Sequence, residues 1–486
     1  MDLLTAAVDA YRSVPLERDA WLHGGRDGWR RALELSLRRG KAARHTVKEI
    51  TAELAEFLLA NNGSPGFMLT EISALLREAR SVGQERARDL AHHFVSLATL
   101  VAGHHRLKRA YEREANAWFS QAGETDLATE CIERVAQTYV DEADERLTQD
   151  KGALIAGTFI EKAIATVRSL PRKYRAARGL DGKLQQLRVR LSDIRELSLE
   201  QMMRIDSDPI DITSYVHNAR EMVSGKERLE ALVSLAGINP LIDATQAMAD
   251  GRERLRGSLS RLIRSSTFSA DGRKVATRAV LDGDEPHDDE VFAEVVRSFD
   301  FRIVLIVNGL IYPALEVLML EHRFDTGFLA DICYESPVVP SGHAGLWTRG
   351  LWHGLSGDFP SAISVLVPQV EQLVRAHLKA HESFTLFVNE DGIETEKGLN
   401  ALLEMPESSQ VLGPDLTLEL RALLCEQLGP NLRNDVAHGL LNDPKSWSVG
   451  AVYAWWLCLR LVVLPYYDML MRTQAQSASE AEKPDE

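Results

Sequence analysis

The sequence predicts an all-α protein, and two observations carry that prediction. Apolar side chains recur at helical spacing through most of the chain, as in Val47, Ile50, Leu54 and Leu58. Alternating β-branched runs joined by Asn-Gly turns, which are typical of hairpins, are missing from the N-terminal part. We therefore expect an N-terminal helical-hairpin array followed by a C-terminal helical bundle.

Composition describes a soluble globular protein of more than one domain. The chain has 486 residues, 45% hydrophobic and 26% charged, with a net charge of −15. Such an acidic chain does not coat nucleic acid nonspecifically, so any RNA contact must be local or transient. The four cysteines are far apart, which suits a reducing cytoplasm and excludes a disulfide framework. The first residues carry an acid and no basic region before an apolar run, so we expect no signal peptide.

The first 200 residues predict a domain of paired helices. We expect helices over residues 46–59, 70–80 and 84–111, with a break at 61–66. Further helices are expected around 128–140 and 152–170, where small residues allow close packing. The spacing approaches that of tetratricopeptide units, and such arrays serve as scaffolds or bind partners. This domain is therefore predicted to bind a protein partner or trigger.

Two pairs of histidines lie on the predicted helix 84–111, and we expect neither pair to hold a metal. His93 and His104 fall nearly on one face. At 1.5 Å per residue they are about 16 Å apart along the axis, too far for one ion. We therefore interpret them as packed or partly exposed side chains.

Residues 201–289 predict a helical connector with basic character. A first basic stretch precedes the connector, and a second lies within it. Either could contact a polyanion or form a solvated face balanced by acids. Their members are Arg168, Arg172, Lys173, Arg175, Arg178, Lys183, Arg188 and Arg190, and then Arg252, Arg254, Arg256, Arg261, Arg264, Arg273, Lys274 and Arg278. The acidic loop 282–290 marks the next boundary and lacks the ligand pattern of an EF-hand.

Residues 290–472 predict the C-terminal bundle, with a disordered tail over 473–486. Its apolar segments 301–320 and 449–464 could suggest membrane spans, but they contain polar residues such as Glu316 and Arg460. We expect core helices and no membrane. Other elements expected are helices over residues 301–322, 359–380, 395–403, 416–428 and 447–471, and a small strand or loop over 384–391.

The stretch from Gly429 to Leu441 gathers polar side chains in apolar surroundings. Pro430 and Asn431 favour a helix start. A core-facing side of this helix is expected from four apolar residues at helical spacing. These are Leu432, Val436, Leu440 and Leu441.

The polar residues of this stretch allow two interpretations. Asn434 and His438 are four apart and share a helix face, with Arg433 on an adjoining face. Arginine, amide and imidazole together could form a phosphate site with a proton shuttle. Alternatively, this is a well-bonded helix end in which Arg433 pairs with Glu371 or Asp435.

The spacing from Arg433 to His438 resembles the Arg–four residues–His motif of the HEPN superfamily. Residues 290–470 are more specifically similar to the family catalogued as domain of unknown function 4209, which includes the endoplasmic reticulum membrane-associated RNA degradation protein. The resemblance rests on Gly357-Asp358-Phe359, Pro368-Gln369-Val370-Glu371 with Arg375, Asp391-Gly392 with Glu396-Lys397 and Leu399, and Asn431-Leu432-Arg433-Asn434 with Ala437-His438-Gly439.

This resemblance implies a HEPN-like bundle that dimerises around a shared cleft and cleaves RNA without metal or cofactor. His438 would be the general acid and base, Arg433 the phosphate-binding charge, and Asn434 the orienting group. Glu371, Arg375 and Asp435 would support the cleft, although Glu371 and Arg375 could equally form a salt bridge within one helix. The implied role is a bacterial defence or stress effector; the alternative is a non-catalytic adaptor that binds RNA or a protein. No nucleotide-binding loop, nucleophile elbow or HExxH motif competes with this stretch.

Overall fold

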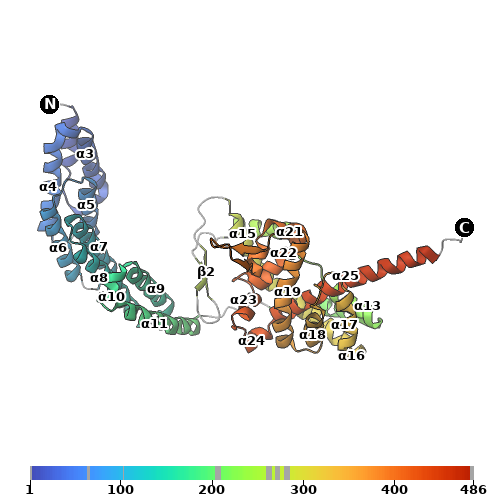
Figure 1. Ribbon diagram of the computed structural model, residues 1–486. Helices are drawn as coiled ribbons and strands as arrows, with labels where there is room; N and C mark the ends of the chain where they lie inside the picture. The colour runs from blue at the N-terminus through green and yellow to red at the C-terminus, as the bar shows by residue number, and fades with distance from the viewer. Residues whose placement is uncertain are drawn as a thin grey trace. The chain divides into compact units, whose positions relative to one another are not determined.

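The prediction of an all-α protein is confirmed, with 77% of the chain helical. In the computed structural model (Figure 1), the structure describes residues 3–62, 66–101, 103–202, 209–258, 265–268, 274–278 and 285–481. The chain divides into two compact units. The N-terminal unit covers Met1–Ile205 with Ala270–Arg273, and the C-terminal unit covers Asp206–Ser269 and Lys274–Glu486.

The described part of the N-terminal unit is a succession of helices. Its elements are α1 (Leu3–Arg12), α2 (Arg18–Ala20), η1 (Trp21–Gly25), α3 (Arg26–Arg38), η2 (Gly40–Ala43), α4 (Arg44–Ala60), α5 (Phe67–Glu78), α6 (Gln84–Leu100), α7 (His105–Ala122), α8 (Thr125–Leu147), α9 (Ala153–Ser169), α10 (Arg172–Ala177) and α11 (Leu180–Gln201).

From α6 onward, each long helix packs mainly on the helix before and after it in the chain. Small residues permit this close approach: Ala115, Ala128 and Ala156 are almost completely buried. Gly123 adopts the left-handed conformation (φ 84°) that ends α7 and starts the turn into α8.

The single helix predicted over residues 84–111 is wrong, because the chain turns between α6 and α7. Gly103 has φ 77° there, a conformation that glycine adopts without steric cost. The two helices then fold back on each other and bury Phe94 and Tyr111. His92 and His93 therefore lie on α6, and His104 is the residue before α7. His105, the first residue of α7, pairs with Glu145 of α8 (2.9 Å).

The described part of the C-terminal unit contains the remaining helices and two short hairpins. Its elements are α12 (Thr213–Val223), α13 (Arg228–Ala236), α14 (Ala244–Gly257), β1 (Ser265–Phe268), β2 (Lys274–Arg278), α15 (Asp288–Ile306), η4 (Val307–Ile311), α16 (Tyr312–Glu321), α17 (Thr326–Glu335), α18 (Ala344–Leu355), α19 (Phe359–Ala380), β3 (Leu386–Val388), β4 (Glu394–Glu396), α20 (Leu399–Leu403), α21 (Pro406–Val411), α22 (Pro414–Leu420), η5 (Arg421–Cys425), α23 (Leu432–Ala437), α24 (Asp443–Ser446) and α25 (Val449–Ala481).

Helix α25 is the centre of this unit, and α13, α15, α17, α18 and α19 pack around its first half. Tyr453, Trp455 and Trp456 on α25 are completely buried. The Trp455 indole lies directly on Gly354 of α18, where a Cβ atom would come within 2.1 Å of the ring. Glycine at this position therefore sets how closely α18 and α25 approach.

Within the region predicted as a connector, residues 201–289, the apolar faces of α12 and α13 join the core that contains α15 and α25. Two predictions in this unit need correction. The helix predicted over 395–403 begins only at Leu399, because residues 394–396 pair antiparallel with 386–388 as strand β4. The tail predicted to be disordered from residue 473 continues α25 to Ala481, and Figure 1 shows this end projecting beyond the bundle.

Two helices of the described chain are long and apolar enough to cross a membrane by length and composition alone. They cover Asp288–Glu321 and Asp443–Ser477, and 50% and 67% of their most apolar windows are buried inside the protein. Core helices of a soluble protein have the same composition, so this finding is weak evidence for a membrane span.

Candidate functional site

Helix α23 carries the predicted site, and it is shorter than the sequence suggests. Gly439 has φ 65°, and its N–H donates to the Val436 carbonyl (3.3 Å). The Leu440 N–H donates to the Asp435 carbonyl (2.8 Å). This pair of bonds is a Schellman motif, which ends the helix at His438.

This early end corrects the predicted core face. Leu432 is 1% exposed, as expected, but Leu440 is 48% exposed because it lies beyond the helix. The start also differs, because Asn431 adopts a left-handed conformation (φ 56°) and makes no capping bond to the helix backbone. Its Oδ1 instead accepts a hydrogen bond from Asn434 Nδ2 (2.6 Å).

Arg433 is held by contacts on both sides of its guanidinium. Its Nε donates to Glu371 Oε2 on α19 (3.0 Å), and its Nη1 donates weakly to Asn434 Oδ1 (3.4 Å). A Cβ atom at Gly398 would lie 2.9 Å from Arg433 Nη2. The guanidinium therefore lies against the backbone that precedes α20.

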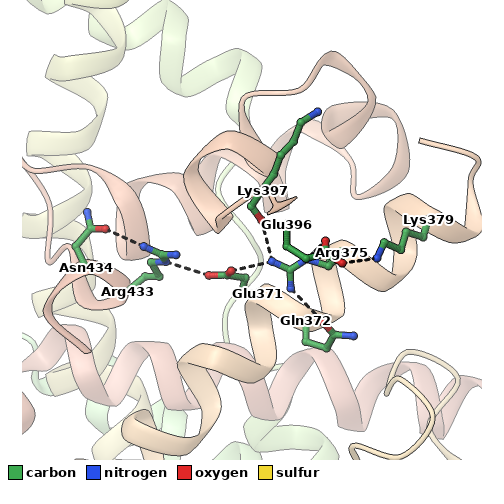
Figure 2. A network of polar contacts seen from close by, with 8 residues as sticks. All are labelled: Glu371, Gln372, Arg375, Lys379, Glu396, Lys397, Arg433 and Asn434. Atoms are coloured by element: carbon green, nitrogen blue, oxygen red, sulfur yellow. Dashed lines mark hydrogen bonds and ion pairs between the residues drawn. The ribbon is translucent and has the colours of Figure 1, made fainter. Parts of the chain in front are cut away.

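Arg433 is the end of a chain of ion pairs, shown in Figure 2, that we call the Glu371 network. Glu371 also accepts from Arg375 Nη2 (2.8 Å), and Arg375 Nε lies 3.0 Å from Glu396 Oε2. Glu396 in turn pairs with Lys379 (2.8 Å). With three cations and two anions, the network has a net positive charge when all of its members are ionised.

Glu371 is ionised because of its two arginine partners. Burial alone would raise the pKa of this carboxyl, but hydrogen bonds and charge from Arg375 and Arg433 outweigh it and lower the pKa below 4.5. Arg375 additionally donates to the Lys397 carbonyl (2.8 Å), which joins α19 to the segment after β4. Glu371 therefore pairs with Arg375, as its spacing predicts, and pairs at the same time with Arg433.

Asp435 lies outside this network. Its side chain is 5% exposed and pairs with Lys445 Nζ on α24 (2.5 Å). Its carbonyl oxygen also accepts the Leu440 and Leu441 N–H groups (2.8 and 3.2 Å). Asp435 thus fixes the end of α23 and the segment after it. Of the two carboxylates that the sequence offers Arg433, Glu371 is its partner and Asp435 is not.

His438 occupies the exposed C-terminal end of α23. Within the described residues, no hydrogen bond or ion pair of its side chain is found. The Asn434 amide is bonded instead to Asn431, to Arg433 and to the Cys425 carbonyl (3.5 Å). The proposed orientation of the imidazole by Asn434 is therefore not observed in the single chain.

An open pocket of about 370 Å³ lies beside Asn434. It is polar, and Asn400 Oδ1 is buried there without a hydrogen-bond partner in the described structure. Sequence reasoning missed this pocket because its walls come from separate short elements. The lining residues are Ala276, Asn400, Glu404, Arg421, Cys425, Glu426, Gln427, Leu428 and Asn434.

The other sequence candidates resolve into ordinary surface contacts. Six of the basic residues pair with acids, which agrees with the second interpretation for those six. Observed ion pairs are Arg175–Asp181, Arg178–Glu133, Arg190–Asp144, Arg252–Asp288, Arg254–Glu294 and Arg256–Glu285. Arg261, Arg264 and Arg273 lie outside the described residues. Within the described ranges, no cluster of three or more His, Cys, Asp or Glu side chains could hold a metal ion.

Comparisons with protein-family models, curated proteins and solved structures find no match to this chain. The resemblance of the C-terminal region to the HEPN superfamily therefore stays a prediction made from its motifs.

Proposed function

We propose that the C-terminal unit is a HEPN-like bundle that acts as a metal-independent endoribonuclease. Arg433, Asn434 and His438 form its site, and the active form is a homodimer. The N-terminal helices form a hairpin array that binds a protein partner or trigger. The protein works in the cytoplasm as an effector of anti-phage defence or stress response.

The observation that carries this proposal is the exposed imidazole of His438, five residues after an arginine that the fold fixes in place. The end of α23 is held by Asp435, Lys445 and the left-handed Gly439. Histidine is the side chain best suited to accept and return a proton at neutral pH. A rigid helix end therefore presents such a group to solvent, where an RNA strand can reach it.

The chemistry requires no group beyond these side chains. His438 removes the proton of a ribose 2′-hydroxyl, whose oxygen attacks the adjacent phosphorus. The bond to the 5′-oxygen breaks, and that oxygen receives a proton from an imidazolium. The products are a 2′,3′-cyclic phosphate and a 5′-hydroxyl end. Arg433, 23% exposed at its side chain, stabilises the additional negative charge on the phosphate.

Two exposed apolar side chains support pairing of two copies at this end of the bundle. Leu440 is 48% exposed and Trp447 is 56% exposed, and both follow His438 closely in the chain. Exposed aromatic side chains such as Trp447 are enriched in protein interfaces. A second copy covering them would bring its own His438 toward the first.

The direct test is incubation of the purified full-length protein with total RNA in EDTA. Wild type should produce cyclic-phosphate ends, and Arg433→Ala and His438→Ala should each reduce cleavage at least ~100-fold. His381→Ala is the matched control, because His381 is also exposed at a helix end, that of α19. Intact RNA with wild type, together with equal growth of cells expressing wild type and variants, would exclude catalysis.

The second candidate is a non-catalytic dimerisation or adaptor protein, and the Arg433–Glu371 pair favours it. A guanidinium already neutralised by a carboxylate is a weaker phosphate ligand. In that case Arg433→Ala lowers stability without affecting RNA, and expression of wild type is harmless. An active nuclease is instead expected to slow growth unless its motif is mutated.

A further inference from the structure

A second pocket in the C-terminal unit shares no lining residue with the site on α23. Its volume is about 300 Å³, and its walls are mostly apolar. Isoleucine, leucine and tyrosine side chains of α12 and α15 and of their flanking segments form these walls. The lining residues are Ile210, Ile212, Tyr215, Asn239, Arg302, Leu305, Ile306 and Leu310.

Arg302 is the one charged residue among the described lining residues, and no described carboxylate forms an ion pair with it. No hydrogen bond or ion pair of its side chain is found within the described chain, and its Nε is buried without a partner. A buried guanidinium N–H without an acceptor is costly, so a site of this kind favours an entering oxygen ligand.

Among the described residues, the carboxyl that interacts electrostatically with Arg302 is Glu419. Its oxygens accept the Ile242 N–H (2.6 Å) and the Tyr453 hydroxyl (3.1 Å) rather than a hydrogen bond from Arg302. Arg460 lies at the same end and donates to two backbone carbonyls, those of Ala236 and Asn239, rather than to a carboxylate. Neither arginine therefore forms an ion pair with a described carboxylate.

The wall of the pocket also departs from regular helix. Residues Val307–Ile311 form the π-helical turn η4, which follows Arg302, Leu305 and Ile306 directly and includes Leu310. Single π-helical turns in α-helices are frequently found at functional sites. A Cβ atom at Gly309 would lie 3.3 Å from Tyr215 Cβ, so this turn also lets α12 come close.

We propose that this pocket binds a small amphiphilic carboxylate, with its apolar chain against the isoleucine and leucine walls and its carboxylate on Arg302. An apolar wall with one guanidinium that no described carboxylate pairs with fits a ligand that has both parts. The volume is at the lower end of ligand pockets, which span about 300–1,000 Å³, so the chain is short or medium in length. This inference is independent of RNA cleavage.

The test compares octanoate with octanol by titration calorimetry on the full-length protein. Octanoate should bind at one site with a Kd on the order of 0.1 mM, and octanol should bind at least ~10-fold more weakly. Arg302→Gln should weaken octanoate binding ~10- to 100-fold and leave octanol binding unchanged. Equal binding of the two ligands, or no saturation by octanoate at ~10 mM, would overturn the proposal.

A second pair of variants tests the proposal even if Arg302→Gln fails to fold. Ile210 is 54% exposed, so Ile210→Glu and Ile210→Gln should both fold and melt like wild type. Ile210→Gln should weaken octanoate and octanol binding equally, because it removes apolar contact with the chain of either ligand. Ile210→Glu should weaken octanoate binding by a further ~10-fold through repulsion of the carboxylate. Equal effects of both variants would contradict an anion site. Binding of anionic vesicles that disappears in Arg302→Gln, without octanoate binding, would assign this surface to lipid headgroups and also refute the proposal.

Discussion

Glu371→Gln should destabilise the C-terminal unit by about 2–3 kcal/mol. Glu371 is 19% exposed at its side chain and neutralises Arg375 and Arg433, which are 12% and 23% exposed. Removing one partner of a fully buried ion pair costs about 3–5 kcal/mol, because the remaining charge stays desolvated. The partial exposure here reduces that cost, and a glutamine oxygen still accepts one hydrogen bond.

The matched control is Glu396→Gln in the same network. Glu396 also faces two cations, Arg375 and Lys379, but it is 48% exposed, so its loss should cost less than about 1 kcal/mol. The chain divides into two compact units, so hydrogen exchange of α19 and α23 amides in the full-length protein is the suitable measurement, because it reports on the C-terminal unit alone. Equal protection losses for the two variants would show that burial of Glu371 does not matter.

The pH dependence provides a further check on the same carboxyl. Its pKa is lowered in the folded state, so its contribution to stability is present above the unfolded pKa, near 4.5, and is lost as pH falls through the folded pKa. Wild type and Glu371→Gln should therefore differ most at neutral pH and converge in acid. A difference that stays constant down to the acid range would mean that the carboxylate charge is not what stabilises the fold.

Two other predictions concern the core of the C-terminal unit. Gly354→Ala should destabilise the C-terminal unit by about 3 kcal/mol, because the added methyl group overlaps the Trp455 ring. The control is Gly345→Ala on the same helix, which has open space around its Cβ and should stabilise the unit by up to about 1 kcal/mol. Urea unfolding measures both changes. Burial raises the pKa of Glu419 to about 7, so ionisation destabilises the fold as pH rises from about 4.5 to about 7. Glu419→Gln should remove this decline, worth up to about 3 kcal/mol, and unchanged pH dependence in thermal melts would refute it.

The helices could be predicted from apolar spacing, but their ends depended on single backbone positions. Periodicity gave α4, α9 and α19 nearly to the residue. It failed between α6 and α7 and after α23, because Gly103 and Gly439 adopt left-handed conformations that turn the chain. Apolar residues on both sides of such a turn keep a helical spacing by coincidence, so the sequence pattern alone does not reveal the break.

The polar contacts at the site could be predicted only in part. The Glu371–Arg375 pair could be predicted from its spacing of four residues. The Arg433–Glu371 pair was one of two alternatives, because both carboxylates were plausible partners until α19 and α23 were placed side by side. The bonds of Asn434 to Asn431 and Cys425 were not predicted, since they depend on the left-handed turn before α23 and on the π-helical turn η5.

Within one chain, the described residues hold the side chain of Arg433 in place but do not hold that of His438. Arg433 is fixed by contacts to α19, to the segment before α20 and to its neighbour Asn434, so its position is a property of the fold. His438 has its backbone fixed by the end of α23, but within the described residues no side chain orients its imidazole. A general acid and base must be held within hydrogen-bond reach of the reacting hydroxyl. The proposed reaction therefore requires that a second copy of the chain, or the RNA itself, supply the contact that orients His438.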